Sequence, residues 1–160
     1  PRVSIAVEIV NRQRTVPLAA RWLERITRRA IVAIGAETAE ITVLVVGDRG
    51  IAALHDRWLG IPGPTDVLTF DLADKTAAAG LAGDIAVSIE TARRVARELG
   101  WQPRYELAYY VVHGLLHLAG ENDDTPGNRR RMRRRERDVM KAVGLPPPPR
   151  RPRRPFTHAR

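Results

Sequence analysis

The segment that most constrains the fold is residues 41–46, with the sequence ITVLVV. An almost unbroken run of apolar and β-branched residues of this length is typical of a β-strand that is covered on both faces. At 160 residues, the chain suits a single domain with one core of ordinary size. We therefore expect one layered domain built around a buried sheet.

Three other segments resemble strands and five resemble helices. Residues 3–9 alternate polar and apolar side chains, as in a strand with one buried face, and residues 67–70 and 84–89 are two shorter candidates. The Ala/Gly-rich residues 76–83 are expected to be poorly ordered. Helical periodicity and end signals predict helices at residues 17–34, 50–59, 90–99, 103–119 and 125–143. The predicted class is α+β, a single domain with a mixed, mostly four-stranded sheet packed with about five helices.

The composition limits the chemistry available to a site. The chain has no cysteine, which excludes a disulfide framework and a thiolate metal site, so a metal must be held by nitrogen and oxygen ligands. No apolar run approaches the roughly 20 residues that cross a bilayer, and the N-terminus lacks the hydrophobic core of a signal peptide. We expect a soluble, cytoplasmic protein without a membrane partner.

Positive charge is concentrated near the C-terminus. Residues 129–160 contain 13 Lys and Arg and two acids, whereas residues 1–128 contain 14 and 16. This asymmetry favours a polyanion such as RNA as the partner, with a solubilising tail as the alternative. Residues 145–160, rich in Pro and Arg, are expected to be a disordered basic tail after a domain of residues 1–144. The arginines expected to bind RNA phosphates are Arg129, Arg130, Arg133, Arg134 and Arg137.

The candidate chemistry lies in residues 113–123, HGLLHLAGEND. His113 and His117 are about one helical turn apart, so both rings leave the same face and can converge on one ion. Gly120 can adopt a left-handed conformation and turn the chain back, which would bring Asp123 to the same ion. Three such ligands leave the fourth tetrahedral position to water, which is the arrangement of a catalytic zinc site.

Other interpretations of this segment stay open. Asp124 is adjacent and could replace Asp123 as the third ligand. An isolated pair of histidines four residues apart is usually structural. Here, however, two of only four histidines lie on one face of an apolar helix, followed by a glycine and a carboxylate. Buried imidazoles without partners would destabilise that helix, which favours a ligand role. His55 and His158 have no such neighbours and are expected at the surface.

The identity of residue 114 distinguishes between two kinds of metal-dependent hydrolase. Zinc peptidases with the motif His-Glu-x-x-His carry a glutamate at this position as the general base, whereas this chain has Gly114. Peptide hydrolysis would need Glu121 as an improvised base, and cleavage of a phosphodiester by metal-bound hydroxide is favoured instead. Glu106 and Tyr109, seven and four residues before the first histidine, are candidates to hydrogen-bond an imidazole.

The same residues resemble the YbeY family of single-strand endoribonucleases. Three motifs carry the resemblance: HGLLHLAG at 113–120 with a third ligand ten residues after the first histidine, PTDVLTF at 64–70, and GDIAVS at 83–88. With the order of elements, it covers residues 3–144. The resemblance implies a mixed sheet with a zincin-like metal helix and one zinc ion. It also implies roles in ribosomal RNA maturation, at the 3′ end of the small-subunit RNA, and in ribosome quality control.

Two positions depart from the family's pattern. The third ligand is usually histidine, and Asp123 adds a negative charge that alters the Lewis acidity of a bound metal. Six residues before the threonine of its second motif, the family usually carries an arginine. The role ascribed to that arginine is to bind RNA phosphate or to stabilise developing charge. This chain has Leu59 there. Arg57 is the nearest replacement as a catalytic cation, and a solvated surface arginine is the alternative.

The sequence therefore predicts a zinc-dependent endoribonuclease in which His113, His117 and Asp123 act through a metal-bound water. The arginines would bind phosphates without reading base sequence. RNA and the small ribosomal subunit are the expected partners, and no organic cofactor is expected. The alternatives are a zinc peptidase-like hydrolase and a non-catalytic, ribosome-associated RNA-binding factor that keeps the fold.

Overall fold

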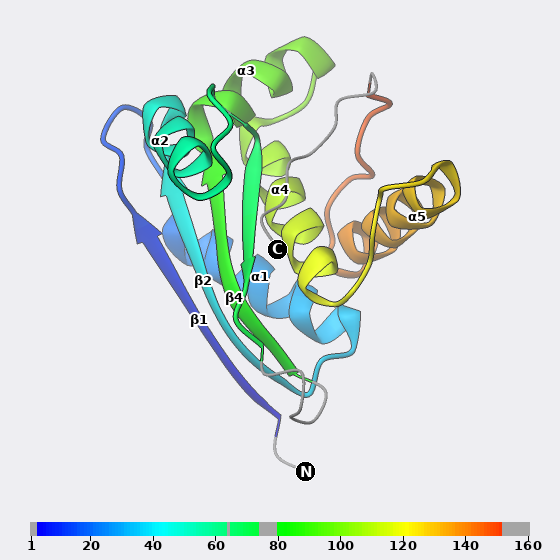
Figure 1. The fold of residues 1–160 in the computed structure, drawn as a ribbon. Coiled ribbons are helices and arrows are strands. Elements are labelled where there is room, and N and C mark those ends of the chain that lie inside the picture. The colour runs from blue at the N-terminus through cyan, green and yellow to red at the C-terminus, as the bar shows by residue number, and fades with distance from the viewer. Residues whose placement is uncertain (1–2, 64, 74–79, 152–160) are drawn as a thin grey trace.

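The computed structural model describes residues 3–63, 65–73 and 80–151, in which it contains one four-stranded sheet and five helices (Figure 1). The strands are β1 (Ser4–Asn11), β2 (Thr38–Val46), β3 (Val67–Asp71) and β4 (Gly80–Ser88). The helices are α1 (Ala20–Ile34), α2 (Asp48–Leu59), α3 (Ile89–Leu99), α4 (Pro103–Leu118) and α5 (Pro126–Ala142). The predicted α+β class is confirmed.

The strands lie in the order β1-β2-β4-β3. β1, β2 and β4 are parallel, whereas β3 pairs antiparallel with β4 and forms one edge of the sheet. The central position of β2 explains its apolar sequence, because both of its faces are covered. Val45 faces the larger core and Val46 faces the smaller one, so neighbouring residues of this strand are both buried.

Helices cover both faces of the sheet. α1 and α4 pack on one face, with α3 and α5 against α4, while α2 packs on the other face (Figure 1). The smaller core beneath α2 consists of Val46, Ile51, Leu68 and Ala86. None of the helices in the described residues is both long and apolar enough to cross a membrane. In this arrangement the C-terminal end of α4 and the N-terminal end of α5 lie at one side of the domain, where the candidate site is found.

Two local expectations are corrected by the structure. α1 begins at Ala20 rather than Pro17, after a turn in which the Gln13 side chain hydrogen-bonds the backbone of Thr15 and Val16. Residues 80–83, expected to be poorly ordered, belong to β4; residues 74–79 lie outside the described part of the chain. The small residues of this strand permit close packing.

Gly83 shows why β4 needs small residues. A side chain there would come within 2.9 Å of Leu118 and would also meet the carbonyl oxygen of Phe70. The glycine therefore lets the last turn of α4 lie close to the sheet, rather than marking a flexible segment.

Candidate metal centre

The predicted metal motif lies at the C-terminal end of α4. This helix is buried on nearly all sides, and only 1% of the surface of His113 is exposed. His113 and His117 leave the same face of the helix, and their ring centroids are 4.6 Å apart. Just beyond the helix, Gly120 adopts the left-handed conformation (φ +96°) that the sequence predicts. The turn brings Asp123 back beside the histidines.

His113, His117 and Asp123 form a compact group of possible metal ligands. The two Nε2 atoms are 3.0 Å apart, and Asp123 Oδ2 lies 3.9 Å from the first and 3.8 Å from the second. Ligand atoms bound about 2.1 Å from one tetrahedral zinc lie about 3.4 Å from one another. The observed separations fall on either side of that value, so these three residues fit a zinc ion without a large movement.

The neighbouring carboxylates have other partners. Asp124 Oδ1 accepts a hydrogen bond from Asn128 Nδ2 at 2.7 Å, in the first turn of α5. Glu121 lies 3.2 Å from Arg131 Nε and 3.8 Å from Arg135 Nε. The geometry thus groups Asp123, rather than Asp124 or Glu121, with the histidines.

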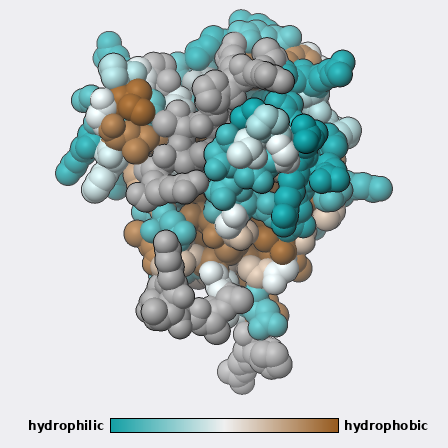
Figure 2. All heavy atoms as spheres, turned by 45° about the vertical axis from the view of Figure 1, so that its right-hand side comes forward, coloured by the Kyte–Doolittle hydropathy of each residue, from teal (hydrophilic) through white to brown (hydrophobic). Residues whose placement is uncertain are grey.

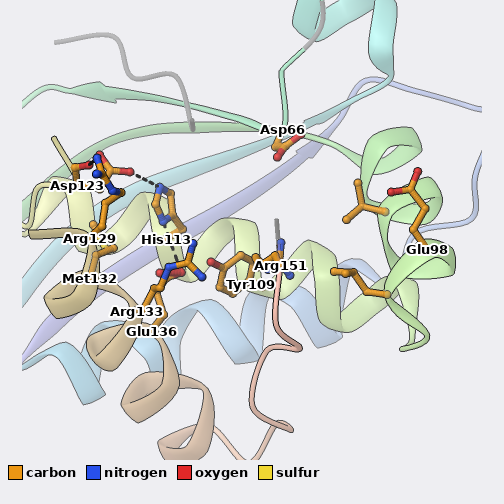
Figure 3. Close-up of a pocket in the computed structure, with 12 residues that line it drawn as sticks. Asp66, Glu98, Tyr109, His113, Asp123, Arg129, Met132, Arg133, Glu136 and Arg151 are labelled. Carbon is orange, nitrogen blue, oxygen red and sulfur yellow. Dashed lines mark hydrogen bonds and ion pairs between the residues drawn. The ribbon is translucent and has the colours of Figure 1, made fainter. Parts of the chain in front are cut away.

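Glu136 of α5 faces the other nitrogen of the first histidine. Its Oε2 atom lies 3.6 Å from His113 Nδ1, and both side chains are almost completely buried (Figure 3). A histidine that binds a metal through Nε2 carries its hydrogen on Nδ1, and a carboxylate at that atom fixes the ring and raises its basicity. The sequence does not single out this residue among the surrounding arginines. Its position midway between the buried Met132 and Met140 was the available signal.

The two candidates for this role on α4 itself are placed differently. Tyr109 lies beside the first histidine, with 6.4 Å between ring centroids. Burial, together with the negative charge and hydrogen bonding of Glu136, raises the pKa of Tyr109 well above its ordinary value. Glu106 is fully buried but accepts hydrogen bonds from Trp101 Nε1 and Arg151 instead. Tyr109 therefore belongs to the surroundings of the site, whereas Glu106 lies one layer further away.

Gly114 faces the sheet, not the candidate metal. A Cβ atom at this position would lie 2.8 Å from Ile85 Cγ2 and 3.0 Å from Thr69 Cγ2. A glutamate here would collide with the sheet, so the general base of a His-Glu-x-x-His peptidase cannot be accommodated at this position without moving the helix.

Two of the five predicted phosphate-binding arginines line the pocket that contains His113 and Asp123. Arg129 and Arg133 extend from α5 toward it, together with Asp66 and Glu98 from the opposite side (Figure 3). Arg129 Nη1 also donates a hydrogen bond to the backbone oxygen of Asp123 at 3.4 Å. The start of α5 therefore supplies positive charge directly beside the candidate ligands.

The other three predicted arginines lie away from this pocket. Arg130, Arg134 and Arg137 line a separate hollow on α5, to which Arg133 also contributes. Hydrophilic residues gather on the right-hand side of the face seen in Figure 2, with hydrophobic residues below them. Arg133 connects the two regions, so the positive surface is continuous from the candidate metal centre along the helix.

Comparisons with known proteins show the family of the chain. The sequence profile of a family described as Endoribonuclease YbeY matches residues 7–144. The chain belongs to this family. An Endoribonuclease YbeY of Anaeromyxobacter sp. (strain Fw109-5) is 42% identical over 79% of this chain and 66% of its own length. An Endoribonuclease YbeY of Geobacter metallireducens is 33% identical over 84% of this chain and 93% of its own.

A solved structure supports the fold separately. The solution structure of a Thermotoga maritima protein matches with a TM-score of 0.59 and 24% sequence identity, over 85% of this chain and 90% of that one. The family match and the two relatives, rather than this structure, confirm the resemblance inferred from the three motifs and place the chain in a family of endoribonucleases. It spans about two thirds of the Anaeromyxobacter relative's length.

The position of the usual YbeY arginine is occupied by a packing residue. Leu59, the last residue of α2, packs against the small core beneath that helix. Arg57 is exposed, with its guanidinium carbon 5.5 Å from the centroid of the Trp58 ring, and it does not line the described pocket. The geometry does not bring Arg57 together with the three candidate ligands.

The expectation that His55 is a surface residue is wrong. Only 4% of its surface is exposed, and its Nδ1 atom lies 2.9 Å from the backbone oxygen of Gly63. His55 follows the buried Ile51 by four residues on the inner face of α2, which explains its burial. It therefore holds the loop that precedes β3, whereas His158 lies outside the described residues.

Proposed function

We propose that this chain is a zinc-dependent endoribonuclease that cleaves single-stranded RNA and holds one zinc ion through His113, His117 and Asp123. The observation that carries the proposal is the compact group of these three side chains in a member of the YbeY endoribonuclease family. The donor set, two imidazoles and one carboxylate, is the type that binds catalytic zinc.

A zinc ion bound there would act as a Lewis acid and lower the pKa of water, supplying a nucleophile at neutral pH. The residues of the chain prepare the site for that ion. Glu136 Oε2, 3.6 Å from His113 Nδ1, would accept the Nδ1 hydrogen in the metal-bound state and so direct Nε2 toward the ligand group, while Gly120 sets the return of the chain to Asp123.

Phosphate binding is assigned to α5. Arg129 and Arg133 line the pocket of the candidate ligands and would hold the phosphates nearest the cleaved bond. Arg130, Arg134 and Arg137 continue the positive surface and would bind the flanking backbone without contacts to bases. Because the pocket itself also contains Asp66 and Glu98, these cations offset a negative potential that would otherwise repel RNA.

The physiological substrate we propose is ribosomal RNA, at the 3′ end of the small-subunit RNA, with the small ribosomal subunit as partner. Residues 1–144 would form the catalytic domain, followed by a basic segment at residues 145–160, in a cytoplasmic protein. These finer assignments rest on family membership together with the clustering of arginines at the C-terminal end.

A non-catalytic, ribosome-associated factor is the second candidate. The observation that favours it is that neither Leu59 nor Arg57 supplies a cation to the described pocket from α2. Loss of a positive group from such a site removes part of the stabilisation of developing charge. A peptidase has less support, because Gly114 is packed on the sheet and Glu121 is paired with arginines.

The proposal is tested by zinc analysis and by cleavage of a labelled single-stranded RNA. We expect about one zinc per chain and metal-dependent cleavage by the native protein, and loss of both in His117→Ala and Asp123→Ala. Asp124→Ala is the matched control, because that neighbouring carboxylate contacts Asn128 rather than the histidines. Zinc binding without cleavage by the native protein would support the non-catalytic factor, and equal losses in Asp123→Ala and Asp124→Ala would reject the assignment of the third ligand.

A further inference from the structure

The segment that follows α5 returns to the candidate metal centre. Leu145 donates a backbone hydrogen bond to Met140 at 2.9 Å and packs against the larger core. The chain then runs beside α4 (Figure 1), and Pro148 to Arg151 line a hollow together with Tyr109 and Glu136. This segment lies beyond residue 144, where the match to the family ends. It is therefore a feature of this chain that the family match does not describe.

Arg151 is the residue through which the segment enters the site. Its guanidinium makes two hydrogen bonds with the carboxylate of Glu106, one of them from Nη1 to Oε2 at 2.8 Å. It also lies over the ring of Tyr109, with 4.0 Å from the guanidinium carbon to the centroid. Only 12% of the arginine side chain is exposed, and the glutamate is fully buried. A solvated tail residue would make none of these contacts.

The buried ion pair of Glu106 and Arg151 is stable only when both residues are present. A buried carboxylate is costly unless it is paired with a cation and hydrogen-bonded, and Glu106 satisfies both conditions through Arg151 and Trp101. No other basic residue in the described part of the chain forms an ion pair with Glu106. The contact therefore fixes the C-terminal segment on α4 while it neutralises a charge in the middle of that helix.

A continuous set of contacts connects Arg151 with His113 (Figure 3). Arg151 covers one side of the Tyr109 ring, Tyr109 interacts with Glu136, and Glu136 faces His113 Nδ1. Arg151 also lines the same pocket as His113 and Asp123. A residue of the C-terminal segment therefore packs on the tyrosine that neighbours Glu136.

Direct phosphate binding is the less suitable role for this arginine. Nη1 and Nη2 are both engaged by Glu106, and Nε is buried without a hydrogen-bond partner. Two of its five N–H donors are used by Glu106, and the burial of the side chain limits the access of a substrate to the other three. Its contacts instead suit a residue that orders other side chains.

We propose that Arg151 is a positioning residue of the metal centre, which holds Tyr109 and Glu136 in place behind His113 and makes the segment at residues 145–151 a wall of the site. Both the effect on metal binding and the effect on RNA cleavage rest on the proposed function. Groups that orient a metal ligand through hydrogen bonds commonly change metal affinity by about 10- to 100-fold.

The test compares Arg151→Ala and Arg151→Lys with Arg150→Ala in the full chain. Arg150 is the adjacent arginine, but its side chain is exposed, so it controls for a loss of charge from the segment. Zinc affinity is measured by competition with a chromogenic chelator, and RNA cleavage is resolved into kcat and KM. We expect Arg151→Ala to weaken zinc binding about tenfold and to lower kcat more than it raises KM. Arg151→Lys, which keeps the charge but loses the planar two-bond contact, should lie between it and the native protein.

A folding defect is separated by the double variant Glu106→Gln/Arg151→Gln. This variant removes both charges and so leaves no buried ion without a partner. We expect it to fold, as judged by circular dichroism and thermal unfolding, and still to bind zinc more weakly than Arg150→Ala does. Equal zinc affinity in the double variant, Arg151→Ala and Arg150→Ala would overturn the positioning role. If the native protein binds zinc but cuts no RNA, the nuclease proposal fails while the zinc measurements still decide the role of Arg151.

Discussion

Glu136 on α5 faces His113 on α4 across a buried contact, with 3.6 Å between Oε2 and Nδ1. The two residues come from helices that are joined by the turn carrying Asp123. One helix therefore supplies the metal-facing rings, the turn supplies the carboxylate, and the next helix supplies the group that orients the first ring. The packing of α5 on α4 is thus part of the site as well as part of the fold.

Replacement of Glu136 by glutamine should weaken metal binding without abolishing it. The amide keeps the shape of the side chain but removes the negative charge that stabilises the Nδ1 hydrogen, so we expect zinc affinity to fall by about 10- to 100-fold. Competition with a chromogenic chelator measures this change. Asp138→Asn is the matched control, because Asp138 is an exposed acid on the same helix. Similar zinc affinities for the two variants would argue against an orienting role for Glu136.

Gly114→Ala should destabilise the protein, because the added methyl group would lie 2.8 Å from Ile85 Cγ2. Overpacking of this kind costs about 1–3 kcal/mol in the free energy of unfolding. Urea unfolding of the metal-free protein measures the effect without contributions from zinc. Gly127→Ala in α5 is the control, since its added Cβ would meet only Arg130 Nη2, at 3.9 Å, and should cost little or be stabilising. A Gly114→Ala protein as stable as the control would show that α4 can move away from the sheet.

The local parts of the site were predictable from the sequence. The spacing of His113 and His117, the left-handed turn at Gly120 and the return to Asp123 all lie within eleven consecutive residues, where helix geometry determines which side chains meet. The strands and helices were also found in the right order, because each carries its own periodicity.

The contacts between distant segments were not predictable in the same way. Arg151 and Glu106 are 45 positions apart, and a Pro/Arg-rich sequence by itself indicates a solvated, extended chain. Glu136 stands among arginines, so its burial is visible only in relation to the apolar positions on its helix. His55 was similarly misassigned, because one polar residue in an apolar stripe can be buried when a backbone oxygen such as that of Gly63 is near.

The stability of the protein should depend on Asp48 at neutral pH. Burial would raise the pKa of Asp48, but hydrogen bonds from Thr91 and Ser88, together with Arg94, outweigh it and hold the pKa below its ordinary value. Because the pKa is lowered in the folded state, this contribution is present above the unfolded pKa of about 3.9 and is lost as the pH falls through the folded value.

Asp48→Asn should therefore lower the free energy of unfolding by about 1 kcal/mol at pH 7, with a smaller difference from the native protein at pH 3. Urea unfolding at the two pH values measures both quantities. Asp56→Asn serves as the control, because Asp56 is an exposed carboxylate on the same helix. A difference that stays the same at both pH values would mean that the charge of Asp48 does not contribute.

The arginines of α5 should affect RNA binding according to their distance from the pocket. When the logarithm of affinity is plotted against the logarithm of salt concentration, each phosphate contact with a single strand contributes about 0.7 to the steepness of the slope. Removing one contact should therefore make the slope shallower by about that amount. We expect Arg130→Ala/Arg134→Ala to weaken RNA binding and to reduce this slope by about 1.4 if both residues contact phosphate, with little change in kcat. Arg129→Ala/Arg133→Ala should also lower kcat, because these two residues line the pocket that contains the metal ligands.

Fluorescence anisotropy across a salt series gives the slopes, and single-turnover cleavage gives the rates. Arg25→Ala/Arg29→Ala, which removes two exposed arginines from α1, controls for net charge. If that control reduces the salt slope as much as the α5 variants do, RNA binding depends on total charge rather than on this helix.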